Sequence, residues 1–253
     1  MNLDPETPRH PAGSHRGLDA DAVSDQLVAA NRILAGLGVL DGFGHVSVRH
    51  PERPDRYLLS RACPPEHVGT DDIMTFDLDS APVDGDGRDP YLERFIHGQI
   101  YASRPDVGAV VHSHAPAVVP FAASSVPLAP VFHMASFLGE GAPVFDMRRH
   151  FGMTDLLIRN NEQAVRLAEA VADTAVVLMR GHGFCAVGRD LPEVVFRAYY
   201  TQQNADLQHR AITLGGAVKY LSSCECELAT RTNQQVLERP WTLWKSKFAD
   251  LGE

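Results

Sequence analysis

The sequence has no long apolar run, no basic cluster and few cysteines, and each absence excludes a class of protein. No stretch of about 18 or more apolar residues is present, so we expect no membrane span and no membrane partner. Lysine and arginine do not cluster and the formal charge is −9, so no nucleic-acid partner is expected. The four cysteines are too few for a disulfide scaffold and are predicted to be reduced thiols. A small-molecule partner is the expectation that remains.

The first residues differ in composition from the rest of the chain. Residues 1–18 are polar and rich in proline and glycine, which predicts a disordered tail without a secretory signal and hence a cytoplasmic protein. With 44% hydrophobic residues over 253 positions, the chain can bury a substantial core, and 19–253 are predicted to form one domain with a C-terminal helical tail. Alternating helix and strand patterns favour an α/β fold in which helices cover both faces of one central sheet.

Apolar spacing indicates where the elements of this fold begin and end. Helices are predicted over 23–37, 91–103, 115–123 and 154–173, followed by a long helix from Pro192. Strands are predicted over 45–50, 56–61, 73–79, 107–114 and 174–181. The segment "RPWTLWKSKF" is an amphipathic tail that would dock on its own subunit or on another.

Two histidines interrupt an apolar run in "VGAVVHSHAP", at the end of a predicted strand. Residues two apart on a strand face the same side, so His112 and His114 would present both imidazoles together. This is a chelating geometry. An isolated pair of this kind is more often satisfied by backbone carbonyls, so the pair alone leaves both interpretations open.

A third histidine follows another apolar strand, in the turn Arg180-Gly181-His182-Gly183. Glycines let the backbone approach a ligand closely, whereas the alternative is an ordinary turn histidine. Three imidazoles are a typical protein contribution to a catalytic divalent cation with open positions for water or substrate. Glu93 and His97 lie four apart and would share one helix face. Beside a cation, Glu93 would be a ligand or an acid/base; otherwise it is a helix-dipole partner.

The order and spacing of these blocks resemble the class II aldolase/adducin family. The resemblance rests on Glu93-x-x-x-His97, "IYASRPDVGAVVHSHAP" and "RGHGFCAVGRDLPE", and it extends from about Asp21 to about Leu214. It implies a mixed, largely antiparallel central sheet and a homotetramer with sites near subunit interfaces. It also implies one divalent metal ion per subunit on His112, His114 and His182, with Glu93 as the acid/base carboxylate. Three histidines do not distinguish Zn, Mn, Fe and Co.

The chain departs from the sugar-phosphate aldolases of this family where those enzymes bind phosphate. The first turn reads Gly44-His45-Val46-Ser47, the second reads Leu59-Ser60-Arg61-Ala62, and Tyr91 and Leu92 precede the glutamate. The bulkier, more apolar wall favours a flat aromatic substrate, contacted by Ser60, Arg61 and Tyr91. Arg61 is suited to clamp a carboxylate, although a surface ion pair at the strand end is the alternative.

The altered residues, with "PLAPVFHMASFLGEGAPVFDMR", are similar to a branch that decarboxylates hydroxylated aromatic or pyridine carboxylates, which suggests aromatic compound catabolism. The expected function is therefore a lyase in which the metal accepts charge, Glu93 delivers a proton, and His45 or His133 assists. For His133 the alternative is a histidine packed in a loop. A retro-aldolase acting on a hydroxy-ketone or sugar phosphate is the runner-up. An iron-dependent oxygenase and a noncatalytic adducin-like module are the rivals from other classes.

Overall fold

One seven-stranded sheet organises the computed structural model, which describes residues 19–83, 85 and 87–249. The strand order is β3-β2-β1-β4-β7-β6-β5, and every neighbouring pair is antiparallel except β5 with β6. The strands are β1 His45–Arg49, β2 Arg56–Ser60, β3 Ile73–Asp77, β4 Ala109–Ser113, β5 Val144–Phe145, β6 Val176–Met179 and β7 Gly183–Gly188. The predicted mixed, largely antiparallel sheet is confirmed. The disordered tail predicted over 1–18 lies outside the described residues.

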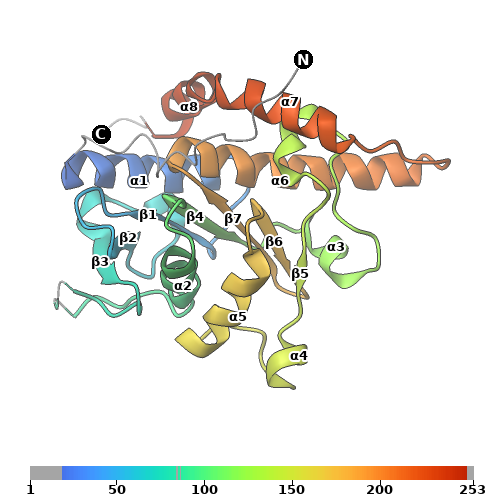
Figure 1. Cartoon of the computed structure of the whole chain (residues 1–253). Helices are drawn as coiled ribbons and strands as arrows, with labels where there is room; N and C mark the ends of the chain where they lie inside the picture. The colour runs from blue at the N-terminus through green and yellow to red at the C-terminus, as the bar shows by residue number, and fades with distance from the viewer. Residues whose placement is uncertain (1–18, 84, 86, 250–253) are drawn as a thin grey trace, which may run out of the picture.

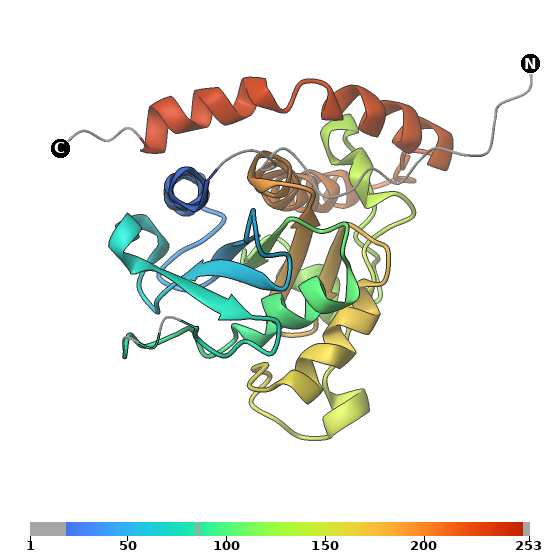
Figure 2. The ribbon, with the colours of Figure 1, turned by 60° about the vertical axis from the view of Figure 1, so that its left-hand side comes forward.

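Helices cover both faces of this sheet, as the predicted three-layer arrangement requires (Figures 1 and 2). Helices α1 and α6 lie on one face and α2 and α5 on the other, with α7 and α8 outside α1 and α6 (Figure 1). The α-helices are α1 Ala20–Gly36, α2 Phe95–Ser103, α3 Val119–Ala123, α4 Arg148–Phe151, α5 Asn161–Val171, α6 Leu191–Thr213, α7 Ser223–Gln234 and α8 Glu238–Trp244. Within the described residues, no helix combines the length and apolarity that crossing a bilayer requires.

The two faces of the sheet belong to separate apolar clusters, because side chains alternate along each strand. In β1, Val46 and Val48 are fully buried in the cluster that contains residues of α1 and α6. Val110 of β4 is buried in the other cluster, with residues of α2 and α5. Each fully buried aliphatic side chain stabilises the fold by about 1.5–3 kcal/mol. The remaining positions of β1 therefore face α2; they are His45, Ser47 and Arg49.

Several parts of the chain differ from the sequence-based expectation, among them the helix predicted over 115–123, which is α3 Val119–Ala123. The helix predicted over 154–173 begins only at Asn161, because the Asn160 side chain accepts the N–H of Gln163 and caps it there. The helix predicted from residue 91 begins at Phe95, so Glu93 lies in the turn before α2. Strands β5 and β7 were not predicted, and β7 makes "HGFCAVGRD" the returning arm of a hairpin with β6.

The C-terminal tail docks on its own chain. Trp241 and Trp244 of α8 are buried in the cluster that contains α1 and α6 residues. The Trp244 ring lies 5.3 Å from that of Tyr199 in α6, in an edge-to-face arrangement. Of the two docking alternatives for this amphipathic segment, the structure therefore contains the intramolecular one.

Candidate metal centre

The hairpin β6–β7 and the end of β4 bring the three histidines of interest to one edge of the sheet. His112 is paired across the sheet with Cys185 of β7 on one side and His45 of β1 on the other. The β6–β7 turn carries His182, and Gly183 makes its close approach to β4 possible. A Cβ at Gly183 would stand 2.1 Å from the backbone oxygen of Ser113, which no side chain could tolerate.

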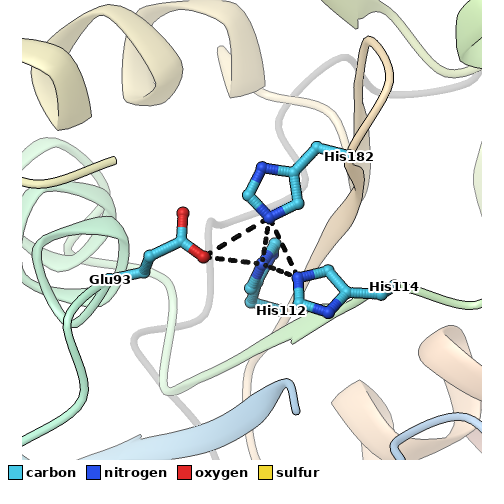
Figure 3. A group of neighbouring side chains, drawn as sticks. All are labelled: Glu93, His112, His114 and His182. Atoms are coloured by element: carbon cyan, nitrogen blue, oxygen red, sulfur yellow. Dashed lines mark hydrogen bonds and ion pairs between the residues drawn. The ribbon is translucent and has the colours of Figure 1, made fainter. Parts of the chain in front are cut away.

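The three imidazoles converge on one point (Figure 3). The Nε2 atoms are 3.0 Å apart for His112 and His114, 2.9 Å for His114 and His182, and 3.3 Å for His112 and His182. Glu93 Oε2 completes the group, 3.3 Å from Nε2 of His182 and 3.6 Å from Nε2 of His112. All four atoms lie within 4.8 Å of one another.

The orientation of the rings fits a divalent cation. His112 Nδ1 lies 3.2 Å from the backbone oxygen of Phe184, and His182 Nδ1 lies 2.9 Å from that of Leu156. A carbonyl accepts only, so both hydrogens are on Nδ1 and the Nε2 lone pairs face each other. Such lone pairs repel unless a positive charge lies between them. Tetrahedral coordination at about 2.0–2.1 Å would place nitrogens about 3.3 Å apart, close to the observed spacing.

Glu93 is held from two sides. Its Oε1 accepts the backbone N–H of Ile158 at 2.9 Å, while Oε2 faces His112 and His182. Burial alone would raise the pKa of this carboxyl. The interactions with His112 and His182 outweigh that effect and hold the pKa well below its usual range. The carboxylate is therefore ionised and directed at the cluster.

The same environment shifts the pKa values of His114 and His182 in opposite directions. For His114, burial first and then His112 and His182 lower the pKa to about 4, so the ring is neutral and able to ligate a metal. For His182, burial acts in the same direction, but the Glu93 carboxylate outweighs it and raises the pKa. A cluster of one carboxylate and three imidazoles could bind a divalent metal ion.

A loop that sequence patterns had assigned to a helix supports the cluster from behind. Residues 154–158 supply the Leu156 carbonyl to His182 and the Ile158 N–H to Glu93. Leu156 has a φ of 70°, in the left-handed region that favours glycine. No sequence signal marks this role, because it is performed by backbone groups rather than side chains.

The predicted substrate residues lie beside the cluster on β1 and after β2. The Tyr91 ring lies 4.6 Å from that of His45, which is 5.2 Å from that of His112. The Tyr91 hydroxyl donates to the Cys63 carbonyl, and burial raises its pKa to about 12. Ser60 is fully buried, and its Oγ faces the Tyr91 hydroxyl.

Arg61 forms the strand-end ion pair that the sequence left as an alternative. Its Nε lies 2.5 Å from Oδ1 of Asp72, and the Arg61 side chain is 44% exposed. Within the part of the chain that is described, no partner holds its Nη atoms at hydrogen-bond distance. Asp72 therefore orients the guanidinium and leaves its terminal donors available.

Two other histidines do not join the cluster within a single chain. His97, on the helix predicted to carry Glu93, is fully buried and bonds to His45 and Ser47 instead of facing the Nε2 atoms. His133 is exposed on the short helix His133–Leu138 and lines a cavity of about 360 Å³ with residues of α7. The bonds of His97 were missed, although the spacings His45-x-Ser47 and His97-x-x-x-Tyr101 place each pair on one face.

The sequence of this chain is similar to those of known proteins. The family described as "Class II Aldolase and Adducin N-terminal domain" matches residues 25–209. "Decarboxylase tropJ" of Talaromyces stipitatus is 39% identical over 81% of this chain and 86% of its own length. "3,4-dihydroxyphthalate decarboxylase" of Arthrobacter keyseri is 31% identical over 90% of this chain and 93% of its own.

A solved structure has the same fold at low sequence identity. An aldolase II superfamily protein from Pseudomonas syringae superposes with a TM-score of 0.76 at 18% identity. The match covers 91% of this chain and 93% of that one. At this identity the likeness concerns the fold alone, so function is argued from the site and from the sequence relatives.

Proposed function

This chain belongs to the class II aldolase and adducin family, and on that premise we propose that it is a divalent-metal-dependent carbon–carbon lyase that decarboxylates a hydroxylated aromatic or heteroaromatic carboxylate. The observation that carries the proposal is the convergence of three Nε2 atoms and one carboxylate oxygen within 4.8 Å. The rings of His45 and Tyr91 lie beside them, and Tyr91 stands where the sugar-phosphate aldolases that this chain resembles have a serine.

The ligands of the cation are His112, His114 and His182, with Glu93 as a fourth ligand or as the acid/base. The chemistry that a divalent cation supplies in such a site is Lewis-acid stabilisation of negative charge on an oxygen beside the breaking bond. Zn, Mn, Fe and Co all accept imidazole ligands, so the proposal extends to one divalent ion per subunit and not to its identity.

Glu93 moves the proton. As an ortho-hydroxy carboxylate binds, the ionised Glu93 takes the proton of the ring hydroxyl. When the bond between ring and carboxylate breaks, its electron pair stays on the ring carbon and CO2 leaves. Glu93 then delivers its proton to that carbon, so atoms and charge balance without a further reactant. The Ile158 N–H fixes Oε1 of the carboxylate and keeps Oε2 directed at the reacting side.

The remaining predicted residues orient the substrate. Tyr91 offers an aromatic wall against a flat ring, and the buried Oγ of Ser60, beside the Tyr91 hydroxyl, offers a hydrogen bond to a carboxylate. Arg61, held by Asp72, would bind a second carboxylate through its Nη atoms. His133 lies apart in one chain, so its assistance requires that it reach the site of a neighbouring subunit.

The test is to incubate metal-loaded protein with two panels, hydroxylated aromatic carboxylates and hydroxy-ketone phosphates, and to measure released CO2 and free aldehyde. CO2 from the first panel with metal-dependent rates is the expected result. Aldehyde from the second panel would favour the retro-aldolase, and oxygen consumption would favour an oxygenase. The absence of all three products in metal-loaded protein would leave a noncatalytic module.

Three finer properties also belong to this proposal. A homotetramer with sites near subunit interfaces, a cytoplasmic location and a role in aromatic compound catabolism would accompany the enzyme. Large side chains exposed around the site are consistent with coverage by a neighbouring subunit, with Phe43 71% and Leu92 46% exposed. Light scattering on the metal-loaded protein measures the assembly directly.

A further inference from the structure

A chain of hydrogen bonds leads from the metal centre into the protein interior. His45 Nδ1 lies 2.6 Å from His97 Nε2, and His97 Nδ1 lies 2.6 Å from Ser47 Oγ. Ser47 Oγ lies 2.8 Å from the Tyr101 hydroxyl, which ends the chain. All four residues are 3% exposed or less, so water does not compete for these bonds.

The chain results from the matching periodicities of a strand and a helix. His45 and Ser47 are two apart on β1 and point toward α2, whereas His97 and Tyr101 are four apart on α2 and point back. His45 is also the cross-strand partner of His112, with ring centroids 5.2 Å apart. The outer end of the chain therefore lies next to a predicted metal ligand.

Each member of the chain has a limited supply of hydrogens. Burial lowers the pKa of His97 to about 3, so this ring is neutral and carries one N–H. His97 has a hydrogen-bond partner at each of its two nitrogens, so it donates to one partner and accepts from the other. The tautomer of His97 therefore sets the direction of the bonds on both sides of it.

One direction satisfies every group. The Tyr101 hydroxyl donates to Ser47, the Ser47 hydroxyl donates to His97 Nδ1, and His97 Nε2–H donates to His45 Nδ1. His45 then carries its hydrogen on Nε2. Among the described residues, the His45 side chain forms its one hydrogen bond at Nδ1, which leaves Nε2–H to a ligand.

The opposite direction leaves a buried hydrogen without an acceptor. If His45 donated to His97, His97 would donate to Ser47 Oγ, and either the Ser47 hydroxyl or the Tyr101 hydroxyl would have to donate outside this network. In the described part of the chain, the Ser47 hydroxyl bonds only to His97 and Tyr101, and the Tyr101 hydroxyl bonds at side-chain level only to Ser47. The backbone N–H of Val110 also faces the phenol oxygen, and a donor there opposes a second donor. An unsatisfied buried hydroxyl is unfavourable, so the first direction is preferred.

We infer that Tyr101, Ser47 and His97 are positioning residues that lock His45 as the Nε2–H tautomer, so that His45 acts on the substrate as a hydrogen-bond donor and not as a base. This inference rests on the proposed function for the identity of the acceptor. An anionic oxygen of a hydroxylated aromatic carboxylate is the group that such a donor would stabilise as charge develops.

The tautomer is measured by two-bond 1H–15N correlation spectra of the protein labelled with 15N-histidine, with and without Zn²⁺. Signals of His45 and His97 are assigned by their loss in His45→Asn and His97→Gln. The expected wild-type result is a hydrogen on Nε2 of both rings. Protonation of His45 at Nδ1 would overturn the inference, whatever the protein catalyses.

Two matched tyrosines test the anchor of the chain. Tyr101→Phe removes the terminal hydroxyl and is expected to mix the His45 tautomers. Tyr57→Phe removes an equally buried hydroxyl that bonds to Ser80 and the Arg94 carbonyl, outside the chain, and should leave the spectrum unchanged. If Tyr101→Phe does not fold, Ser47→Ala is the second variant, because it removes the hydroxyl that links Tyr101 to His97 in the series of hydrogen bonds. An unchanged His45 tautomer in a folded variant of either kind would refute the anchoring role.

Kinetics separate positioning from simple packing. His97→Leu should lower kcat by on the order of 10²-fold at unchanged KM and metal content. Without His97, the Nε2–H of His45 is no longer held toward the oxygen that becomes negatively charged in the transition state. His97→Gln places an amide N–H2 near the Nε2 position and should restore most of the rate. Equal losses in both variants would contradict a donor role for His97. Wild-type protein that shows the Nε2–H tautomer but releases no CO2 would refute the proposed function and leave the tautomer lock standing.

Discussion

Two buried glutamates at opposite ends of the β4–β7 pair have opposite surroundings. Glu93, 7% exposed, faces Nε2 of His112 and of His182, whose rings donate their hydrogens from Nδ1 to backbone carbonyls. Glu193, 2% exposed, lies beyond the other end of β7 and is fully paired. Its Oε2 accepts from Nε and the backbone N–H of Arg189, and its Oε1 accepts from Nη2 of Arg197.

The difference teaches how to separate a functional cluster from a structural one. At Glu193, donors and acceptors match, so the network needs nothing further and contributes to the fold. At Glu93, the carboxylate and the Nε2 lone pairs of His112 and His182 converge, and a cation would satisfy all of these acceptors. Burial is similar at both ends, and the balance of donors and acceptors distinguishes them.

Removing a histidine from the cluster at Glu93 should have the largest effect on function. His114→Ala is expected to reduce bound metal from about one ion per chain to almost none and to reduce turnover to background, because two imidazoles hold a divalent ion poorly. Metal analysis and a CO2-release assay measure both. A fully active variant without metal would discard the cluster as the catalytic centre.

The same substitution at each glutamate should give opposite outcomes. Glu93→Gln is expected to lower turnover by about 10²–10⁴-fold, because the amide cannot carry the proton. Its stability should change by less than about 1 kcal/mol, because the Ile158 N–H keeps an acceptor. Denaturant unfolding and steady-state rates are the measurements.

Glu193→Gln should instead cost about 3 kcal/mol of unfolding free energy, because Arg189 and Arg197 lose their shared charge partner. Turnover of the folded variant should stay close to wild type. Were Glu193→Gln to abolish catalysis while leaving stability intact, the division between the two ends would be wrong.

Glu193 and its arginine partners should also determine part of how the free energy of unfolding depends on acidic pH. Burial would raise the pKa of Glu193, but Arg197, Arg189 and the Arg189 N–H outweigh it and hold the pKa below its ordinary value. A depressed folded-state pKa gives stability that is present above the unfolded value of about 4.5 and is lost as pH falls through the folded value. The stability difference between wild type and Glu193→Gln should therefore be constant near neutral pH and shrink below about pH 4.5. Unfolding curves from pH 7 to pH 3 measure this difference. A difference as large at pH 3 as at pH 7 would contradict the assignment.

The smallest expected effects come from two residues with positive φ. Leu156, with φ 70°, holds His182 through its carbonyl, whereas Ala172, with φ 45°, ends α5 away from the cluster. Leu156→Gly should weaken metal binding by about tenfold, because a freer carbonyl orients the ring less well. Ala172→Gly should raise stability by up to about 1 kcal/mol and leave metal affinity unchanged. Calorimetric titration with Zn²⁺ compares the two, and equal metal affinities would remove the support role of the 154–158 loop.

Residue spacing predicted the side chains of the cluster but not what holds them. The H-x-H pair and the histidine in the glycine turn follow from strand periodicity, from the positive φ of Gly181 and from the missing side chain of Gly183. The loop carrying Leu156 and Ile158 was predicted as helix, because its contribution is a carbonyl and an N–H that every residue possesses. The Asn160 cap that ends this loop is a local signal that would have placed the helix start correctly. The His45–His97 contact depends on how α2 packs on β1, which periodicity alone does not give.

The most direct test of the metal centre is anomalous diffraction from crystals of the metal-loaded protein. We predict one peak per chain, at about 2.0–2.2 Å from the Nε2 atoms of His112, His114 and His182. Its absence from this position, in crystals shown by absorption to contain the metal, would contradict the account.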